Sequence, residues 1–135
     1  MRYADATVGQ SIDQAEYKVE RVNLVMYAGA SGDFNPIHWS PSFAKAVGLP
    51  DTIATGMHTM GRIGTYLTDF AGAGGAVVRI RNRFTAPIVV GDEGASVTIS
   101  GTITSKGPDN VVTVAFEAES AGANVSKGDA DVRLA

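Results

Sequence analysis

The spacing of apolar residues changes abruptly in the middle of the chain. Over residues 57–70 they recur every three or four positions, which is typical of one face of an amphipathic helix. Over residues 78–84 alternate side chains are polar, which is typical of a strand with one face on a core. The side chains predicted to face that core are Val78, Ile80, Asn82 and Phe84. One long apolar helix followed by strands predicts an α+β fold, in which an antiparallel sheet wraps around a central helix.

Turn and capping signals divide the rest of the chain. Ser40 as the N-cap, Pro41 at the first helical position and Gly48 as the stop predict a short helix. Apolar spacing predicts another helix over residues 21–30, without an obvious N-cap. Alternation predicts further strands at 11–19, 95–106, 111–120 and 125–134, with turns at 107–110 and 121–124. No linker or repeat interrupts the chain, so we expect a single domain over residues 1–135.

Composition excludes several classes of protein. The chain has 135 residues, no cysteine and a formal net charge of −3. Without cysteine there is no disulfide, thiolate nucleophile or iron–sulfur cluster, and a weakly acidic chain lacks the basic footprint of a nucleic-acid binder. No apolar run reaches membrane-spanning length, so we expect no membrane association and a cytoplasmic location.

Glycine is frequent, with 16 residues, and three of them lie in or beside the predicted central helix. Each glycine in a helix interior costs up to about 1 kcal/mol relative to alanine. Gly56, Gly61 and Gly64 therefore predict that another backbone or a ligand approaches this helix closely.

The residues best suited to chemistry lie in the polar loop at residues 31–38. Asp33 and His38 are five positions apart, so a carboxylate and an imidazole can converge on one water molecule, as general acid–base catalysis requires. Pro36 stiffens the loop between them. One carboxylate and one histidine are too few for a metal site. In the alternative, Asp33 and Asn35 only cap turns and His38 is an incidental surface residue.

Three stretches of the chain resemble one family. Residues 27–44 contain Ser-Gly-Asp-Phe-Asn-Pro-Ile-His-Trp, residues 53–57 read Ile-Ala-Thr-Gly-Met, and residues 83–87 read Arg-Phe-Thr-Ala-Pro ahead of Gly91-Asp92. In this order they resemble the MaoC-like dehydratases, the (R)-specific enoyl-thioester hydratases, which have a hot-dog fold. Within that family the chain most resembles the catalytic subunits of bacterial (3R)-hydroxyacyl-ACP dehydratases.

The resemblance implies a function and a set of site residues. The implied reaction is the reversible hydration of a trans-2-enoyl-CoA or enoyl-ACP to the (3R)-hydroxyacyl thioester, with no cofactor. Asp33 and His38 are the implied catalytic pair, Asn35 is their support, and the Gly56 amide donates to the thioester oxygen. An N–H at the start of a helix suits that task, because it is unpaired and lies at the positive end of the helix dipole. Thr55 stands where the family usually has histidine, which affects how this segment is held.

Other residues have weaker signals. His58 is a competing catalytic histidine, but no carboxylate neighbours it in the motif, and a structural role is favoured. Gly61 stands where some family members have serine, and with Gly64 it leaves space for an acyl chain beside the helix. A set of basic residues alternates along one predicted strand: Arg79, Arg81 and Arg83. These either bind phosphates of coenzyme A or acidic residues of a carrier protein, or are solvated arginines.

Hot-dog domains generally pair through their sheets, so the resemblance implies a homodimer or a heterodimer with a related subunit. Two other functions remain open. In a thioesterase on the same fold, the Asp33 carboxylate would activate water against the carbonyl. The chain could also be a non-catalytic acyl-binding partner subunit. Asp33 together with the Asn-Pro-Ile-His stretch disfavours the thioesterase. The presence of both Asp33 and His38 disfavours the binding subunit, since a binding module needs neither.

Overall fold

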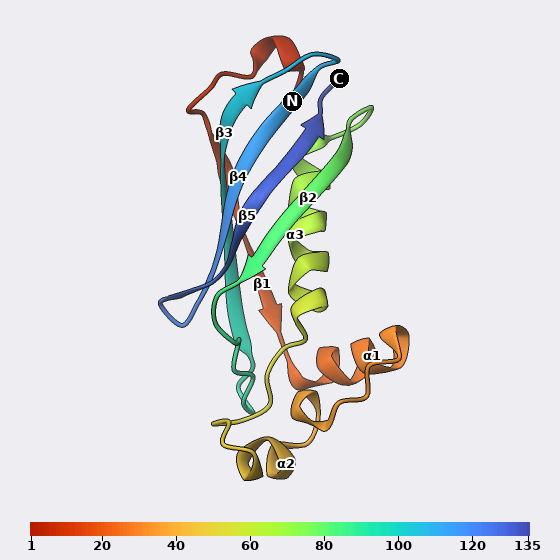
Figure 1. Cartoon of the computed structure of the whole chain (residues 1–135), viewed down its shortest axis with the longest axis vertical. Helices are drawn as coiled ribbons and strands as arrows, with labels where there is room; N and C mark the ends of the chain where they lie inside the picture. Colours follow the sequence, from red (N-terminus) through yellow and green to blue (C-terminus); the bar gives the residue numbers. More distant parts are fainter.

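The computed structural model describes residues 1–135 and contains a five-stranded antiparallel sheet with a long helix against it (Figure 1). The strands lie in the order β1-β3-β4-β5-β2. Their bounds are β1 Ser11–Val19, β2 Ala76–Phe84, β3 Ala95–Lys106, β4 Val111–Ser120 and β5 Ala123–Arg133. The helices are α1 Arg21–Ser31, α2 Pro41–Ala46 and α3 Gly56–Ala71, with 3₁₀ turns at Tyr3–Asp5 and Pro36–His38. The predicted α+β fold is confirmed.

Helix α3 lies along one face of the sheet and buries its apolar side there (Figure 1). Ile63 and Leu67 are fully buried, and Tyr66 is nearly so. Gly101 on β3 makes room for the tyrosine, because a Cβ at that position would lie 3.1 Å from the phenolic oxygen. The helix predicted over residues 57–70 is confirmed and is one residue longer at each end. No helix, α3 included, is long and apolar enough to cross a membrane.

Among the three helix glycines only Gly56 is closely approached within the chain, and a side chain rather than the predicted backbone approaches it. A Cβ on Gly56 would lie 3.0 Å from the ring of Phe84. A Cβ on Gly61 would meet nothing within 4 Å, and one on Gly64 would meet only the Ile80 side chain, at 4.0 Å. The prediction of a neighbouring backbone is wrong at these two positions within the chain, because Gly61 is exposed and Gly64 faces one flexible side chain. The alternative, a ligand beside the helix, stays a prediction.

The predicted core face of β2 is correct for two of its four residues. Ile80 and Asn82 are half-buried, whereas Val78 is 52% exposed and Phe84 is 47% exposed. A bulge after Val77 in the pairing with β5 adds one residue and shifts the alternation of the strand. Val77 therefore packs against the core in place of Val78. Phe84 ends the strand and lies over Gly56 instead.

The hairpin turns depend on residues with positive φ. Asp109 and Asn110 have φ of 55° and 58° between β3 and β4, and Ala121 and Gly122 have φ of 51° and 76° between β4 and β5. Two successive residues with positive φ match the twist of antiparallel strands, so a two-residue connection suffices. The second turn is therefore shorter than predicted, and β5 begins at Ala123.

The starts of α1 and α2 are capped by side chains. At α2, the Ser40 hydroxyl accepts a hydrogen bond from the Phe43 N–H at 3.3 Å, as the sequence predicts. At α1, Glu20 and Asn23 form a reciprocal capping box, in which Asn23 Oδ1 accepts the Glu20 N–H at 2.7 Å. The second cap was not evident in the sequence, because glutamate is not a typical N-cap residue.

Candidate active site

The loop between α1 and α2 is held by its own side chains. Asp33 Oδ1 accepts a hydrogen bond from the Asn35 N–H at 3.1 Å, and Asn35 Oδ1 accepts one from the Ile37 N–H at 3.3 Å. Pro36 begins the 3₁₀ turn that ends at His38. Asp33 and Asn35 therefore do cap turns, and this capping determines where His38 lies.

The capped loop brings Asp33 and His38 together. Asp33 Oδ2 lies 3.9 Å from His38 Nε2. The His38 side chain is 10% exposed, whereas the Asp33 side chain is 46% exposed. A buried imidazole beside an exposed carboxylate can share one incoming water molecule. The predicted convergence of the two side chains is confirmed, and the predicted surface position of His38 in the alternative is wrong.

The second ring nitrogen of His38 determines where its proton lies. His38 Nδ1 is 2.7 Å from the carbonyl oxygen of Ile53. Because a carbonyl oxygen only accepts hydrogen bonds, Nδ1 carries the proton. The neutral ring then has its lone pair on Nε2, the atom that faces Asp33. His38 is thus arranged to accept a proton at Nε2 and to donate it from the same atom.

Ile53 also ties the loop to the segment that leads into α3. Its N–H donates to the Ile37 carbonyl at 3.1 Å, so Ile53 contacts consecutive residues of the loop through both backbone groups. On the other side, the Ala54 N–H donates to the Ile88 carbonyl at 2.9 Å. The segment before α3 is therefore fixed from two directions, and His38 is fixed relative to it.

Helix α3 begins at Gly56, whose N–H has no acceptor within the chain. Thr55, the N-cap residue, is buried, and its side chain makes no capping hydrogen bond. The Gly56 N–H is therefore available to a ligand, and the helix dipole favours a ligand oxygen that gains negative charge. Threonine at position 55 leaves this N–H free.

His38 and Gly56 line one cavity of about 390 Å³. Thr59 of α3 lines it too, and most of the remaining wall is the stretch from Phe84, the last residue of β2, to Ile88. The Phe84 ring rests on Gly56 so closely that any side chain at position 56 would displace it. Gly61 and Gly64 do not line the cavity. Another hollow, of about 350 Å³ between β1 and α3, contains none of the predicted catalytic residues.

Sequence reasoning missed two sides of this cavity. Residues 83–87 were used only as a family motif, although Phe84 was already expected to face inward. Thr59 gave no signal, because a threonine within an apolar helix pattern is not distinguishable from a packing residue.

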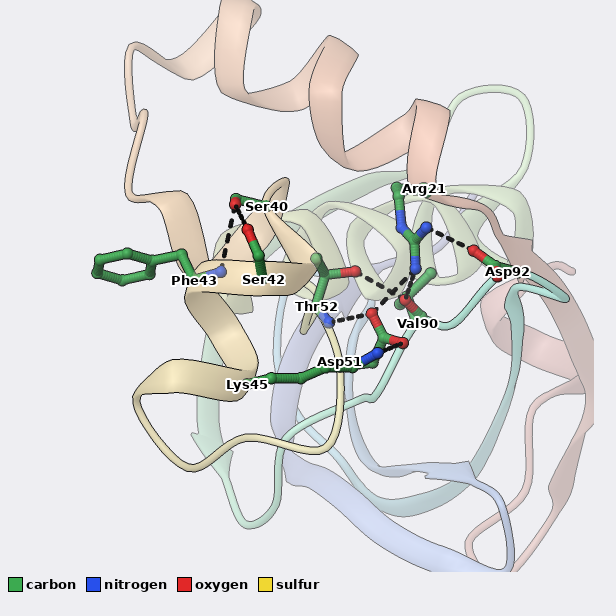
Figure 2. Close-up of polar contacts among 9 residues, drawn as sticks. All are labelled: Arg21, Ser40, Ser42, Phe43, Lys45, Asp51, Thr52, Val90 and Asp92. Atoms are coloured by element: carbon green, nitrogen blue, oxygen red, sulfur yellow. Dashed lines mark hydrogen bonds and ion pairs between the residues drawn. The ribbon is translucent and has the colours of Figure 1, made fainter.

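A charged cluster fixes the segment that leads to α3 (Figure 2). Arg21, the first residue of α1, donates to Asp51 Oδ1 at 2.9 Å and to Asp92 Oδ1 at 2.6 Å. The Thr52 N–H donates to the same Asp51 oxygen at 2.8 Å. This N–H, with the charges of Lys45 and Arg21, lowers the pKa of Asp51 below its usual value. The cluster joins residues that are far apart in the sequence, so it could not be predicted from a local sequence motif.

Comparison with known proteins identifies the family. Residues 4–121 match the family model described as MaoC like domain. The chain belongs to the MaoC-like domain family. The (R)-specific enoyl-CoA hydratase of Rhodospirillum rubrum is 32% identical over 134 residues, covering 98% of this chain and 90% of that protein.

Solved structures agree with this MaoC-like assignment. A MaoC-like dehydratase is 36% identical with a TM-score of 0.94, covering 99% of this chain and 42% of the other. The unliganded R-hydratase PhaJ1 from Pseudomonas aeruginosa is 27% identical with a TM-score of 0.90, covering 98% of this chain and 84% of the other. The expected hot-dog fold is confirmed.

His58, the competing histidine of this MaoC-like chain, does not line the cavity. Its ring packs edge to face on Tyr27, with ring centroids 5.4 Å apart. Its Nδ1 is buried without a partner. Burial, and secondarily the charge of Arg62, lowers the pKa of His58. These contacts favour the structural role.

Two of the three arginines on β2 are engaged in ion pairs. Arg79 donates to Asp131 and Asp129, and Arg81 donates to Asp129, at 2.7–2.9 Å. A phosphate would compete with these carboxylates. Arg83 has no ion pair and is exposed, so it is the member of the set available to an anion. Phosphate binding by this MaoC-like strand stays a prediction.

Proposed function

We propose that this chain reversibly hydrates a trans-2-enoyl thioester to the (3R)-3-hydroxyacyl thioester, and so is a hydro-lyase. One observation carries the proposal: the cavity lined by His38 and the free Gly56 N–H has the Asp33 carboxylate beside it. The names of two relatives, (R)-specific enoyl-CoA hydratase and R-hydratase PhaJ1, support the same reaction.

The reaction requires a polarised carbonyl and two proton transfers. The Gly56 N–H donates to the thioester carbonyl oxygen and stabilises the negative charge that develops there as water attacks C3. Asp33 or His38 takes a proton from that water, and the pair returns a proton to C2 from the same face. The C2–C3 π bond is replaced by a C–O and a C–H bond, so all atoms of the water are accounted for.

Asn35 acts as a positioning residue in this scheme. Its side chain caps the turn that carries His38, and its N–H is bound by Asp33. It thereby sets the relative position of the two catalytic groups without contact with the substrate.

The direct test is crotonyl-CoA with the enoyl absorbance and free thiol followed together. Loss of absorbance without thiol is the expected result. Thiol release would identify a thioesterase and contradict the proposal. No change in either signal would contradict it too, and would leave an acyl-binding or partner role.

Substrate contacts outside the cavity are part of the proposal. Arg83, exposed and unpaired beside Phe84, is proposed to bind a phosphate of coenzyme A or an acidic carrier protein. The open space at Gly61 and beside Gly64 is proposed to accept the acyl tail or a second subunit.

We also propose that the chain pairs with a second hot-dog subunit through the outer edge of β2. Both β1 and β2 are edge strands of the sheet. The exposed side chains of β1 are all polar or charged, whereas β2 exposes Val78 and Phe84 beside its three arginines. Apolar residues on an unpaired edge favour pairing with another strand.

A further inference from the structure

Two threonine hydroxyls line the cavity with His38 and Gly56. Thr85 Oγ1 donates to the carbonyl oxygen of Asn124 at 2.8 Å. Thr59 Oγ1 makes no hydrogen bond to the rest of the chain, although Thr59 is only 5% exposed. A hydroxyl that lines a cavity and has no partner within the chain is free to bond a ligand there.

The geometry of α3 explains why this hydroxyl is free. Threonines in helices commonly donate to the carbonyl oxygen four residues earlier. Thr65 and Thr68 of the same helix do so, at 3.2 and 2.8 Å. The equivalent acceptor for Thr59 is the Thr55 carbonyl oxygen, which already accepts the N–H groups of His58 and Thr59 at 3.0 and 3.3 Å. Both lone pairs of that oxygen are therefore occupied.

The direction of the side chain brings the free hydroxyl toward Gly56. Side chains of an α-helix tilt toward its N-terminus, so each lies over the residue three or four positions earlier. Thr59 is three positions after Gly56 and lines the same cavity. The Gly56 N–H and the Thr59 hydroxyl therefore belong to the wall of the same cavity, one helical turn apart.

We infer that the Thr59 hydroxyl donates a second hydrogen bond to the thioester carbonyl oxygen, beside the bond from the Gly56 N–H. This inference rests on the proposed function, since it names a further contact of that site. The charge on the oxygen is largest in the transition state, so the bond is strongest there and acts on kcat more than on KM. The hydroxyl keeps its proton, and no covalent bond to Thr59 forms.

Thr59→Val, Thr59→Ser and the control Thr65→Val test the inference. Valine keeps the shape of threonine and removes the donor, so Thr59→Val should lower kcat for crotonyl-CoA by about 10²-fold. Its melting temperature should be close to that of the wild type, because valine keeps the shape of the side chain and no hydrogen bond within the chain is lost. Thr59→Ser should keep most of the activity, and Thr65→Val should behave like the wild type. A loss of melting temperature that parallels the loss of kcat would overturn the inference.

A spectroscopic measurement separates this inference from the proposed function. Cinnamoyl-CoA is a chromophoric enoyl thioester whose absorbance moves to longer wavelength when its carbonyl accepts hydrogen bonds. Bound to the wild type and to Thr59→Ser it should show this shift, and bound to Thr59→Val a smaller one. The shift is read without turnover, so it stands even if the wild type fails to hydrate crotonyl-CoA. Equal shifts in wild type and Thr59→Val, or no shift in the wild type, would overturn the inference.

Discussion

Asp33 has two tasks that use different oxygen atoms. Oδ1 accepts the Asn35 N–H within the loop, whereas Oδ2 faces His38 Nε2. An asparagine at this position keeps an acceptor for the turn but removes the negative charge. The loop and the acid–base function can therefore be separated by one substitution.

We expect Asp33→Asn to lower kcat for crotonyl-CoA by about 10² or more, with a melting temperature near that of the wild type. His38→Ala should lower kcat on a similar scale, because it removes the Nε2 lone pair from the cavity. Steady-state kinetics and thermal unfolding of the same preparations check both. Near wild-type turnover in either variant would show that the role assignment is wrong.

At this scale, sequence reasoning succeeded where the chemistry is local. Asp33, Asn35 and His38 belong to one short loop, and a proline-stiffened motif is enough to predict that they converge. Thr59 and the wall after Phe84 could not be predicted in the same way, because their contacts with Gly56 form only when α3 packs against the sheet. The carbonyl of Ile53 gave no signal either, since backbone groups are the same in every residue.

The elements themselves were largely predictable, and the errors have local causes. The helix that became α3 followed from the spacing of its apolar residues alone. The prediction of inward-facing residues in β2 failed after Val77, where a bulge adds one residue to the strand. The hydrophobic periodicity of the sequence does not indicate such a bulge. The start of α1 was also hard to predict. Glu20 and Asn23 cap it by reciprocal hydrogen bonds, and neither residue type alone indicates such a cap.

The first turn of α3 carries a pH-dependent contribution to stability. Burial lowers the pKa of His58 in the folded chain below the usual 6.5. As pH falls through that value, the unfolded chain binds the proton before the folded chain does, so the free energy of unfolding decreases. That decrease continues until the lowered pKa of the folded state is reached.

His58→Phe keeps a ring against Tyr27 and removes the titrating group. We expect the variant to lose less unfolding free energy than the wild type between about pH 7.5 and about pH 5.5. Urea unfolding at the two pH values measures the difference. His38 is present in both proteins, so its contribution cancels in the comparison. Equal losses in both proteins would contradict the assignment of the effect to His58.

Arg21 links α1 to the segment before α3 and to the turn that contains Asp92 (Figure 2). Its ion pair with Asp51 is partly buried and lies between exposed and fully buried pairs in strength, whereas Asp92 is 89% exposed and contributes as a surface charge. Arg21→Met should lower the free energy of unfolding by about 1–3 kcal/mol.

Lys45→Met is the matched control for Arg21→Met, because Lys45 contacts the same Asp51 at 3.6 Å but is 58% exposed. This variant should lose less than about 1 kcal/mol. Chemical denaturation of both variants provides the comparison. Equal effects would show that Arg21 contributes only as an ordinary surface charge.

Taken as a whole, the molecule has two sheet edges, of which only β2 exposes apolar side chains. Charged and polar side chains cover the outer side of β1, whereas Val78 and Phe84 lie exposed on β2. Helix α3 flanks β2 with Gly61 exposed and Gly64 only partly covered, which leaves its surface smooth on that side. A second subunit could therefore approach both the strand edge and the helix.

We expect the wild type to be dimeric by light scattering, and Val78→Asp to dissociate toward monomer on dilution. A charge buried at a paired edge lacks solvation, which disfavours the dimer. Val8→Asp is the control, because Val8 is also exposed and apolar but lies in the segment before β1. A monomeric wild type, or equal masses for both variants, would contradict pairing through β2.

The configuration of the hydration product tests the central claim most directly. Wild type and Asp33→Asn are incubated with crotonyl-CoA, and the 3-hydroxybutyryl-CoA formed is assigned with dehydrogenases specific for either enantiomer. Hydration by the site of Asp33, His38 and Gly56 predicts the (R) product from the wild type and almost none from Asp33→Asn. The (S) product, free coenzyme A in place of a hydroxyacyl thioester, or equal (R) product from both proteins would contradict it.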